Sequence, residues 1–188
     1  MLNRRRELMA NIGGDMLRPV TALVSSTSPI DTGITITDEI ILKIRAKRCT
    51  EKANAGYMFY DGCTMVTQRN KNYSNESKAF AEAFNPYISQ SSISNYIIDG
   101  VNHSVTWASK SFTASAFVQA TNSVKLAVAM SLYASNGYTY YYITATKNDI
   151  LIHDLRPYLK NEQPGFYDLI TKDFITVAEG EEDWTYIA

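Results

Sequence analysis

Hydrophobic and polar residues alternate most regularly in the segment Thr35–Arg48. The apolar positions there are Ile36, Ile40, Leu42 and Ile44, and polar side chains fill positions between them, namely Thr37, Glu39, Lys43 and Arg45. Successive side chains of a strand point to opposite faces of a sheet. The pattern therefore predicts a strand with one buried and one solvated face.

The C-terminal third of the chain contains three further segments rich in aromatic and β-branched residues: Tyr138–Thr146, Ile150–Tyr158 and Gly165–Ile175. Such residues suit a pleated, half-buried surface. Turn residues separate the three segments, first at Lys147-Asn148-Asp149 and then between Lys160 and Gly165. We expect Pro164-Gly165 to form part of the second turn, because proline fixes φ and glycine tolerates positive φ.

The middle of the chain predicts shorter elements. Gly56–Thr67 contains Asp61-Gly62, a dipeptide typical of hairpin turns, and Ser94–Val105 is interrupted by a similar turn at Asp99-Gly100. By period alone Val124–Tyr133 fits a helix, but its flanking turn residues favour a central strand. Lys78–Phe84 has good helix formers and predicts one or two helical turns.

The segment Gln68–Ser94, which contains those helical turns, is the least regular part of the chain and begins with a long polar stretch. A long irregular segment inside a compact domain is often functional. If the protein has a ligand, we expect this segment to carry the specificity.

Seven or more short strands without alternating helices predict an all-β fold, in which two antiparallel sheets enclose one core. The chain has 188 residues, a length that fits one domain. We assign residues 19–180 to the sandwich, residues 1–18 to an N-terminal docking arm and residues 181–188 to an acidic C-terminal tail.

Charge is distributed unevenly between the two ends of the chain. The proposed assembly arm combines basic and apolar residues, namely Arg4, Arg5, Arg6, Leu8, Met9 and Ile12. The other end carries Glu179, Glu181, Glu182 and Asp183. These ends either pair with each other or with neighbouring subunits, or they are solvated tails. We expect Trp184 and Tyr186 to dock against the body of the protein or a neighbour.

The overall composition limits the classes of partner. The formal net charge is -1, which argues against general affinity for nucleic acid. No apolar run approaches the roughly 20 residues needed to span a bilayer. The N-terminus does not fit a signal peptide, so we expect synthesis in the cytoplasm and no membrane partner.

The two cysteines, Cys49 and Cys63, flank the predicted hairpin, and a bridge between them is conceivable, although we favour free thiols. No spacing of cysteine and histidine resembles a zinc site, and Asp61, Asp99 and Asp149 are isolated in their loops. We therefore expect no metal and no cofactor.

Two stretches near the C-terminus resemble a known family. Leu151–Tyr158 (LIHDLRPY), followed by Pro164–Leu169 (PGFYDL) and Phe174, is similar to the C-terminal signature of LamG-like, concanavalin A-like jelly-roll domains. Such domains are common in virion and tail proteins of phages and prophages of gut bacteria. Ser26–Ile34 (STSPIDTGI) resembles a shorter form of the phrase with which they often open. The resemblance implies a jelly roll.

Laminarinase-type relatives of that fold cleave sugars with carboxylates at positions i, i+2 and i+4 of a strand. Glu179, Glu181 and Asp183 have this spacing but follow the last expected core strand. His103 and His153 are far apart in sequence and have no obvious nucleophile near them. We therefore predict that the chain is not an enzyme, and we keep a glycoside hydrolase relative as a less favoured alternative.

Two functional hypotheses remain. In the first, implied by the resemblance, the chain is a structural or decoration protein of a phage virion, on the head or a tail fibre, and is homo-oligomeric. In the second it is a carbohydrate-binding adhesin module of a bacterial or prophage surface protein. Aromatic rings at period two would form a sugar platform, and the candidates are Tyr138, Tyr140, Tyr142 and Trp107. The alternative is that these rings pack in the sheet core.

Overall fold

The computed structural model describes residues 10–12, 15–26, 28–48, 57–67, 77–84, 93–107, 110–128 and 138–188. Within these ranges every regular element is a β-strand, and all strand pairs are antiparallel. The described part of the chain is therefore all-β, as predicted, and forms two sheets.

The main path of the larger sheet consists, in spatial order, of β1 (Ala10–Ile12), β2 (Asp15–Pro19), β15 (Ile150–Lys160), β14 (Tyr138–Lys147), β5 (Ile40–Arg48), β10 (Ser94–Asp99), β11 (Ser104–Trp107) and β12 (Lys110–Thr113). Four short strands extend it. β16 (Gln163–Asp168) pairs with β15 and β17 (Phe174–Ile175), and β3 (Ala22–Val24) pairs with β14 and β18 (Thr185–Ile187).

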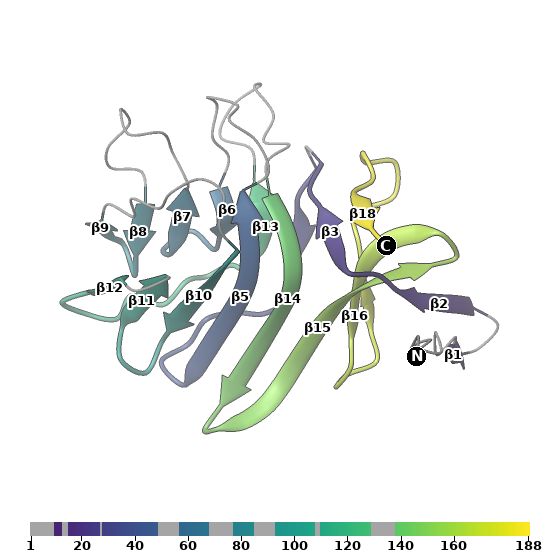
Figure 1. The fold of residues 1–188 in the computed structure, drawn as a ribbon. Coiled ribbons are helices and arrows are strands. Elements are labelled where there is room, and N and C mark those ends of the chain that lie inside the picture. The colour runs from purple at the N-terminus through teal and green to yellow at the C-terminus, as the bar shows by residue number, and fades with distance from the viewer. Residues whose placement is uncertain are drawn as a thin grey trace, which may run out of the picture.

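The smaller sheet consists, in spatial order, of β4 (Ile30–Asp31), β13 (Lys125–Val128), β6 (Tyr57–Tyr60), β7 (Met65–Thr67), β8 (Ser77–Ala79) and β9 (Glu82–Phe84). Figure 1 looks onto the larger sheet, where β10, β5, β14 and β15 run side by side with β13 and β6 behind them. The long strands β14 and β15 form a hairpin that crosses the centre of this face.

The two sheets share one hydrophobic core. Leu42 and Ile44 of the larger sheet belong to the same buried cluster as Met58 and Leu126 of the smaller sheet. The hydroxyl of Tyr140 donates a hydrogen bond to the carbonyl of Met58 and so joins the sheets directly. This arrangement is consistent with the predicted β-sandwich.

Three predicted hairpins are confirmed. The turn at Asp61-Gly62 connects β6 and β7, and the turn that begins at Asp99-Gly100 connects β10 and β11. The turn between β14 and β15 is formed by Asn148 and Asp149, whose φ values are 50° and 61°. Two consecutive residues in the left-handed region match the right-handed twist of the flanking strands.

The prediction of a helix over Lys78–Phe84 is wrong. This segment lies mostly in the β8–β9 hairpin, whose two turn residues, Phe80 and Ala81, have φ values of 50° and 70°. The Phe80 and Phe84 side chains belong to the hydrophobic core. Tertiary packing of these rings thus outweighs the intrinsic preference of alanine and glutamate for a helix.

The second turn of the C-terminal third lies earlier than predicted. Asn161 and Glu162 form it, whereas Pro164 and Gly165 are buried in β16. A Cβ placed on Gly165 would lie 2.5 Å from the Ile175 carbonyl oxygen and from the Phe174 ring. Glycine is required there because β17 approaches the backbone closely, and positive φ plays no part.

The structure describes residues 124–128 of the predicted strand Val124–Tyr133, and Lys125–Val128 form β13. β13 lies between β4 and β6 and is therefore flanked on both sides. Residues 129–137 lie outside the described ranges, as do residues 68–76 and 85–92 of the segment expected to carry specificity.

Both ends of the chain contribute strands to the larger sheet. Asp15–Pro19, most of which falls in the expected docking arm, is β2 and pairs with β15, and Leu17 is buried. At the other end Thr185–Ile187 is β18 and pairs with β3. The arm residues Arg4, Arg5, Arg6, Leu8 and Met9 lie outside the described ranges, and only the backbone of Ile12 is described.

Candidate binding face on the larger sheet

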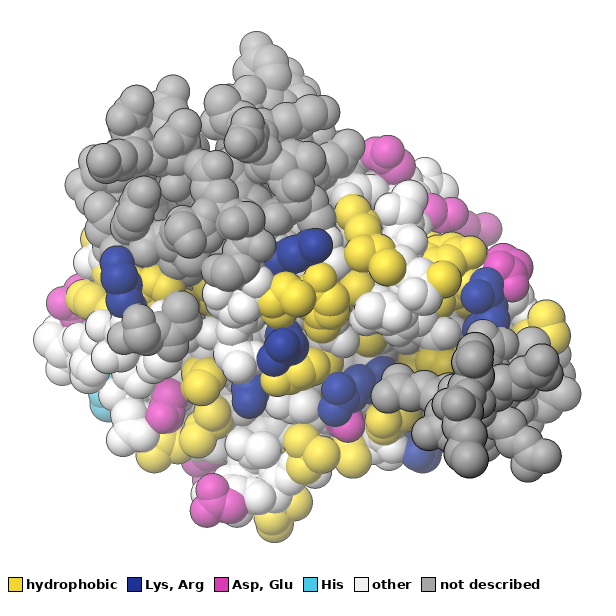
Figure 2. All heavy atoms as spheres, viewed as in Figure 1, with side chains coloured by type: hydrophobic (Ala, Val, Ile, Leu, Met, Phe, Trp, Pro, Cys, Tyr) yellow, Lys and Arg dark blue, Asp and Glu magenta, His cyan; other side chains and the backbone are white. Residues whose placement is uncertain are grey.

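The outer face of the larger sheet carries basic side chains in its centre. On β5, Lys43, Arg45 and Lys47 are half-buried and alternate with buried residues, which are Leu42, Ile44 and Ala46. The alternation places the basic side chains on the side away from the core. Figure 2 shows dark blue side chains gathered in the middle of this face, over β5, β14 and β15.

Tyr142 of β14 lies at the centre of these basic residues. The Arg156 guanidinium carbon lies 4.9 Å from the centroid of the Tyr142 ring, and the Lys43 Nζ lies 5.9 Å from it. The Tyr142 hydroxyl donates a hydrogen bond of 3.2 Å to Oδ1 of Asn95. A cation over an aromatic face is attracted by the ring quadrupole, so these contacts hold the ring in place on the sheet.

The residues of this cluster come from four neighbouring strands. Arg45 of β5 is the cross-strand partner of both Asn95 in β10 and Tyr142 in β14. Arg156 is provided by β15, the next strand along. Its sequence neighbour Leu155 pairs with Ile143 of β14, which is the sequence neighbour of Tyr142. Strands in a sheet are about 4.8 Å apart, so the row from Asn95 to Arg156 spans roughly 15 Å.

A β-bulge decides that Tyr142 faces outward. The register between β14 and β5 shifts between Tyr140 and Tyr142, so the residues on either side of the shift lie on opposite faces. Tyr138 and Tyr140 are only 2% and 0% exposed and pack in the core, whereas Tyr142 is half-buried. The expected row of tyrosines on one face is therefore wrong.

Trp107, the fourth aromatic candidate for the sugar platform, is also a core residue. It lies in β11 and packs against Phe84, with ring centroids 5.1 Å apart. Of the four aromatic residues singled out from the sequence, only Tyr142 lies on the outer face of the sheet. The structure does not bring the other rings to a surface where a ligand could stack on them.

Asp154 is a carboxylate of this face that contacts Arg156. Its Oδ1 lies 2.6 Å from Nε of Arg156, and its backbone is paired with Thr144 of β14. Arg156 keeps 39% of its side chain exposed although it forms this ion pair. The ion pair orients the guanidinium over Tyr142 and leaves part of it accessible to solvent.

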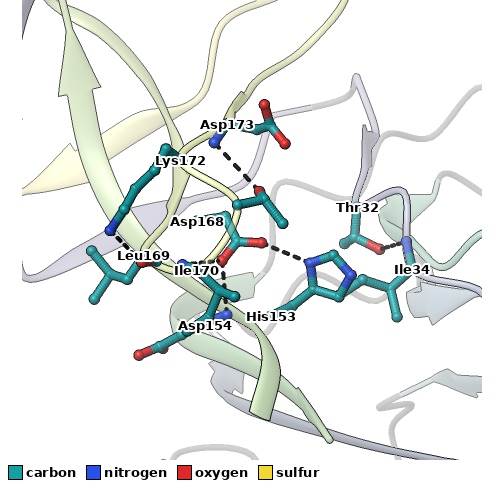
Figure 3. A network of polar contacts seen from close by, with 10 residues as sticks. Thr32, Ile34, His153, Asp154, Asp168, Leu169, Ile170, Lys172 and Asp173 are labelled. Carbon is teal, nitrogen blue, oxygen red and sulfur yellow. Dashed lines mark hydrogen bonds and ion pairs between the residues drawn. The ribbon is translucent and has the colours of Figure 1, made fainter. Parts of the chain in front are cut away.

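A second polar cluster lies between β15 and the end of β16, around His153 and Asp168 (Figure 3). Nδ1 of His153 lies 2.7 Å from Oδ2 of Asp168, and Oδ1 of Asp168 accepts hydrogen bonds from the backbone N–H groups of Asp154 and Ile170. These contacts tie the end of β16 to β15 and satisfy a carboxylate that is only 1% exposed. The geometry therefore indicates a structural role for His153 and Asp168.

Two opposing effects act on the pKa of Asp168. Burial by itself raises the pKa of this carboxyl, but the hydrogen bonds from the Asp154 N–H, from His153 and from the Ile170 N–H outweigh burial and lower it below its usual value. Asp168 thus remains ionised in the folded protein to a lower pH than in the unfolded chain.

The carboxylates at the C-terminal end, Glu179, Glu181 and Asp183, do not lie on a strand, and all three are exposed. Oε2 of Glu181 accepts a hydrogen bond of 3.0 Å from the Ser28 hydroxyl. Nearby, Trp184 is 2% exposed and its Nε1 donates to the Ser28 carbonyl at 2.8 Å. The predicted docking of Trp184 on the body of the protein is confirmed, and these contacts indicate that the segment closes the fold.

Other candidate chemistry is limited to isolated groups. Over the described ranges, no three histidine, cysteine, aspartate or glutamate side chains lie together as metal ligands would. Cys63 is a free thiol whose pKa is raised by burial, and Cys49 lies outside those ranges. The Asp61 carboxylate is buried and accepts hydrogen bonds from the N–H groups of Cys63 and Thr64, so it stabilises the β6–β7 turn.

The comparisons with known proteins leave the family open. No protein-family model, no curated protein and no solved structure matches this chain. In the part of the chain that the structure describes, no helix has the length and apolar character of a membrane span.

Part of the basic cluster can be predicted from the sequence. Lys43 and Arg45 were recognised as the solvated face of a strand, which is confirmed by their half-buried positions opposite a buried face. Asn95 and Arg156 were not recognised, because nothing in their local sequence connects them to Tyr142. Only the pairing of β10, β5, β14 and β15 brings them together.

Proposed function

We propose that this chain is a binding domain for extracellular glycans and that its binding site is the outer face of the larger sheet. The observation that supports this is the cluster around Tyr142, in which one aromatic ring is surrounded by the side chains of Lys43, Asn95 and Arg156. A sugar presents both hydroxyl groups and an apolar ring face. Charged and amide side chains fix the orientation of such a ligand, and the tyrosine provides contact area.

We further propose that the protein is a structural or decoration protein of a phage virion and acts there as a homo-oligomer. The support is the resemblance of LIHDLRPY, PGFYDL and STSPIDTGI to LamG-like virion and tail domains. The same resemblance leads us to propose a jelly-roll topology for the sandwich. Many copies on one particle would gain avidity for a weakly bound glycan.

The proposed role is binding without catalysis. The His153–Asp168 pair is used to join β15 and β16, and Glu181 is used to hold Ser28. Neither pair lies in the Tyr142 cluster, so the proposal assigns no bond-breaking step to the face where the glycan binds.

A glycan array with the purified full-length chain tests the binding role. We expect binding by the wild type and at least a ten-fold loss in Tyr142→Ala. The matched control is Tyr186→Ala, which removes an exposed tyrosine from β18 and should bind as the wild type does. If the wild type binds no glycan, or if both variants bind equally well, the proposed function is wrong.

The location on a virion is tested separately by mass spectrometry of purified phage particles from cells that express the gene. The chain should be present in intact particles at a stoichiometry that indicates many copies. If it is absent from the particles but binds glycans on the array, the protein is an adhesin module of a bacterial or prophage surface.

A further inference from the structure

We infer that the ligand of the larger sheet is an anionic glycan, and that Lys43, Arg45 and Arg156 receive its acidic groups. This inference rests on the proposed function, because it names the class of glycan that binds to the same face.

The basic side chains form an array in two directions. Along β5, Lys43, Arg45 and Lys47 recur at every second position, and such positions are about 7 Å apart. Across the sheet, Arg156 lies two strands from Arg45 in the same row, at roughly 10 Å. An extended polymer with repeated acidic groups matches such an array better than a single small anion does.

Few carboxylates compensate these charges. Among the described residues, no carboxylate forms an ion pair with Lys43, Arg45 or Lys47. The ion pair of Lys147 with Glu39 lies at the end of the β5–β14 pair, and that of Arg18 with Glu162 lies between β2 and the β15–β16 turn. Asp154 is the carboxylate inside the cluster, and it is paired with Arg156.

The local excess of positive charge contrasts with the whole chain, whose formal net charge is -1. Concentrating cations on one face while the molecule as a whole is slightly acidic creates a positive potential there, which attracts anionic ligands.

The chemistry of the side chains fits oxyanions. Arginine presents several N–H donors in a fixed plane and binds carboxylate or sulfate oxygens through charge-assisted hydrogen bonds. Lys43 adds a mobile ammonium group beside the same ring. A uronate carboxylate and a sulfate ester both supply such oxygens, so the binding chemistry is shared and the experiment has to separate the two sources.

Nucleic acid is a poorer match to this face. Proteins that hold single-stranded nucleic acid stack successive bases on several aromatic side chains. In the described part of this face, Arg156 already lies over the ring of Tyr142, and the ring of Tyr158 packs against Tyr167, so neither ring is free to stack on a base.

The test measures binding of the full-length protein to four polymers at several salt concentrations: neutral dextran, dextran sulfate, hyaluronan and single-stranded DNA. The acidic groups of dextran sulfate are all sulfate esters, whereas those of hyaluronan are all carboxylates. We expect at least one of the two acidic polysaccharides to bind at least ten-fold more tightly than dextran, and we expect its affinity to fall as salt rises.

Variants connect this binding to the cluster. The double variant Lys43→Gln/Arg45→Gln should lose at least ten-fold in affinity for the acidic polysaccharide. The control Lys78→Gln/Lys125→Gln makes the same change of charge in the smaller sheet and should lose less than two-fold. Circular dichroism and thermal unfolding check that both variants are folded. The salt dependence of the wild-type affinity tests the role of charge without any substitution.

The outcomes separate this inference from the proposed function. If a neutral glycan binds through Tyr142 while acidic polysaccharides show no advantage, the glycan-binding role stands and the inference is overturned. Equal losses in the two double variants, or tighter binding of single-stranded DNA than of either acidic polysaccharide, also overturn it. If no glycan binds at all, both proposals fail.

Discussion

At the scale of single residues, the buried carboxylate of Asp168 joins the end of β16 to β15. It accepts hydrogen bonds from the N–H groups of Asp154 and Ile170 and contacts Nδ1 of His153. Replacing a buried acceptor of this kind leaves several donors without a partner, which costs more than the hydrogen bonds themselves contribute.

We therefore expect Asp168→Asn to lower the free energy of unfolding by about 2 kcal/mol at pH 7. The lowered pKa of Asp168 means that its stabilisation is present above the ordinary aspartate pKa of about 3.9 and is lost as the pH falls through the lower folded value. The difference from the wild type should accordingly shrink below about pH 4. Urea unfolding of both proteins between pH 7 and pH 3 measures this difference in the free energy of unfolding.

The control for this prediction is Asp173→Asn, because the Asp173 side chain is exposed in the turn that follows β16. This variant should unfold close to the wild type at every pH. A difference for Asp168→Asn that grows as the pH falls would contradict the assignment.

Gly100 lies in the turn that follows β10, and its backbone packs closely against the segment that leads into β5. A Cβ at this position would lie 1.9 Å from the Thr37 carbonyl oxygen, and the Gly100 N–H donates to the Ile40 carbonyl at 2.9 Å. Gly33 provides the contrasting case, because its φ is +71° but nothing lies within 4 Å of an added Cβ.

We expect Gly100→Ala to lower the free energy of unfolding by about 3 kcal/mol or more, because the methyl group clashes with the Thr37 carbonyl and forces the segment before β5 away from the β10–β11 turn. Gly33→Ala adds only the backbone strain of a left-handed alanine, about 1 kcal/mol. Chemical unfolding of the two variants measures the difference, and equal losses would contradict the close approach at Gly100.

At the scale of elements, the β8–β9 hairpin shows how packing overrides local preference. Its turn places Phe80 in the core and holds Ala81 at a φ of 70°, a conformation that costs energy for residues with a Cβ. The Ala81 N–H also donates to the Cys63 carbonyl at 2.7 Å, so the hairpin is attached to the β6–β7 turn.

We predict that Ala81→Gly raises the free energy of unfolding by about 0.5–1 kcal/mol, because glycine adopts positive φ without the Cβ penalty. The matched control is Ala83→Gly in β9, an exposed strand position where glycine should destabilise by about 0.5–1 kcal/mol. Thermal or urea unfolding of the two variants gives the sign of each effect. Destabilisation by Ala81→Gly would argue against the hairpin and for the helix.

The bulge in β14 is the element that creates the candidate binding face. Without the shift between Tyr140 and Tyr142, the alternation of the strand would turn Tyr142 toward the core along with Tyr138. The bulge lets one strand contribute core tyrosines at one end and a surface tyrosine near its middle.

At the scale of the whole molecule, segments distant in sequence share one core. Trp184, near the C-terminus, packs against Tyr140, with ring centroids 5.4 Å apart, and also against Phe166. Trp107 lies toward the other end of the larger sheet, in the same hydrophobic cluster. A single core of this kind indicates one cooperative unfolding unit.

The two tryptophans of the chain allow this cooperativity to be measured. Trp184→Phe leaves Trp107 as the fluorescent reporter, and Trp107→Phe leaves Trp184. In each variant we expect the urea midpoint from fluorescence to coincide with that from far-UV circular dichroism. A midpoint for Trp184 well below the circular dichroism midpoint would show that the C-terminal segment detaches before the sandwich unfolds.

By itself the sequence determined the class of the fold and several of its turns. Alternation in Thr35–Arg48 predicted a strand with one wet face, and the structure contains this strand from Ile40 to Arg48. Asp61-Gly62 and Lys147-Asn148-Asp149 marked hairpin turns that the structure also contains. These features depend on neighbouring residues only, because strand periodicity and turn conformations are properties of a short stretch of backbone.

The tertiary structure alone decided which side chains meet on the candidate face. Asn95, Tyr142 and Arg156 come from three strands, and their proximity depends on strand order and on one shift of register in β14. Likewise Phe80 is buried and Gly165 must remain small only because other strands pack against them. Contacts between distant segments follow from how the whole chain fills one core, and no local pattern encodes them.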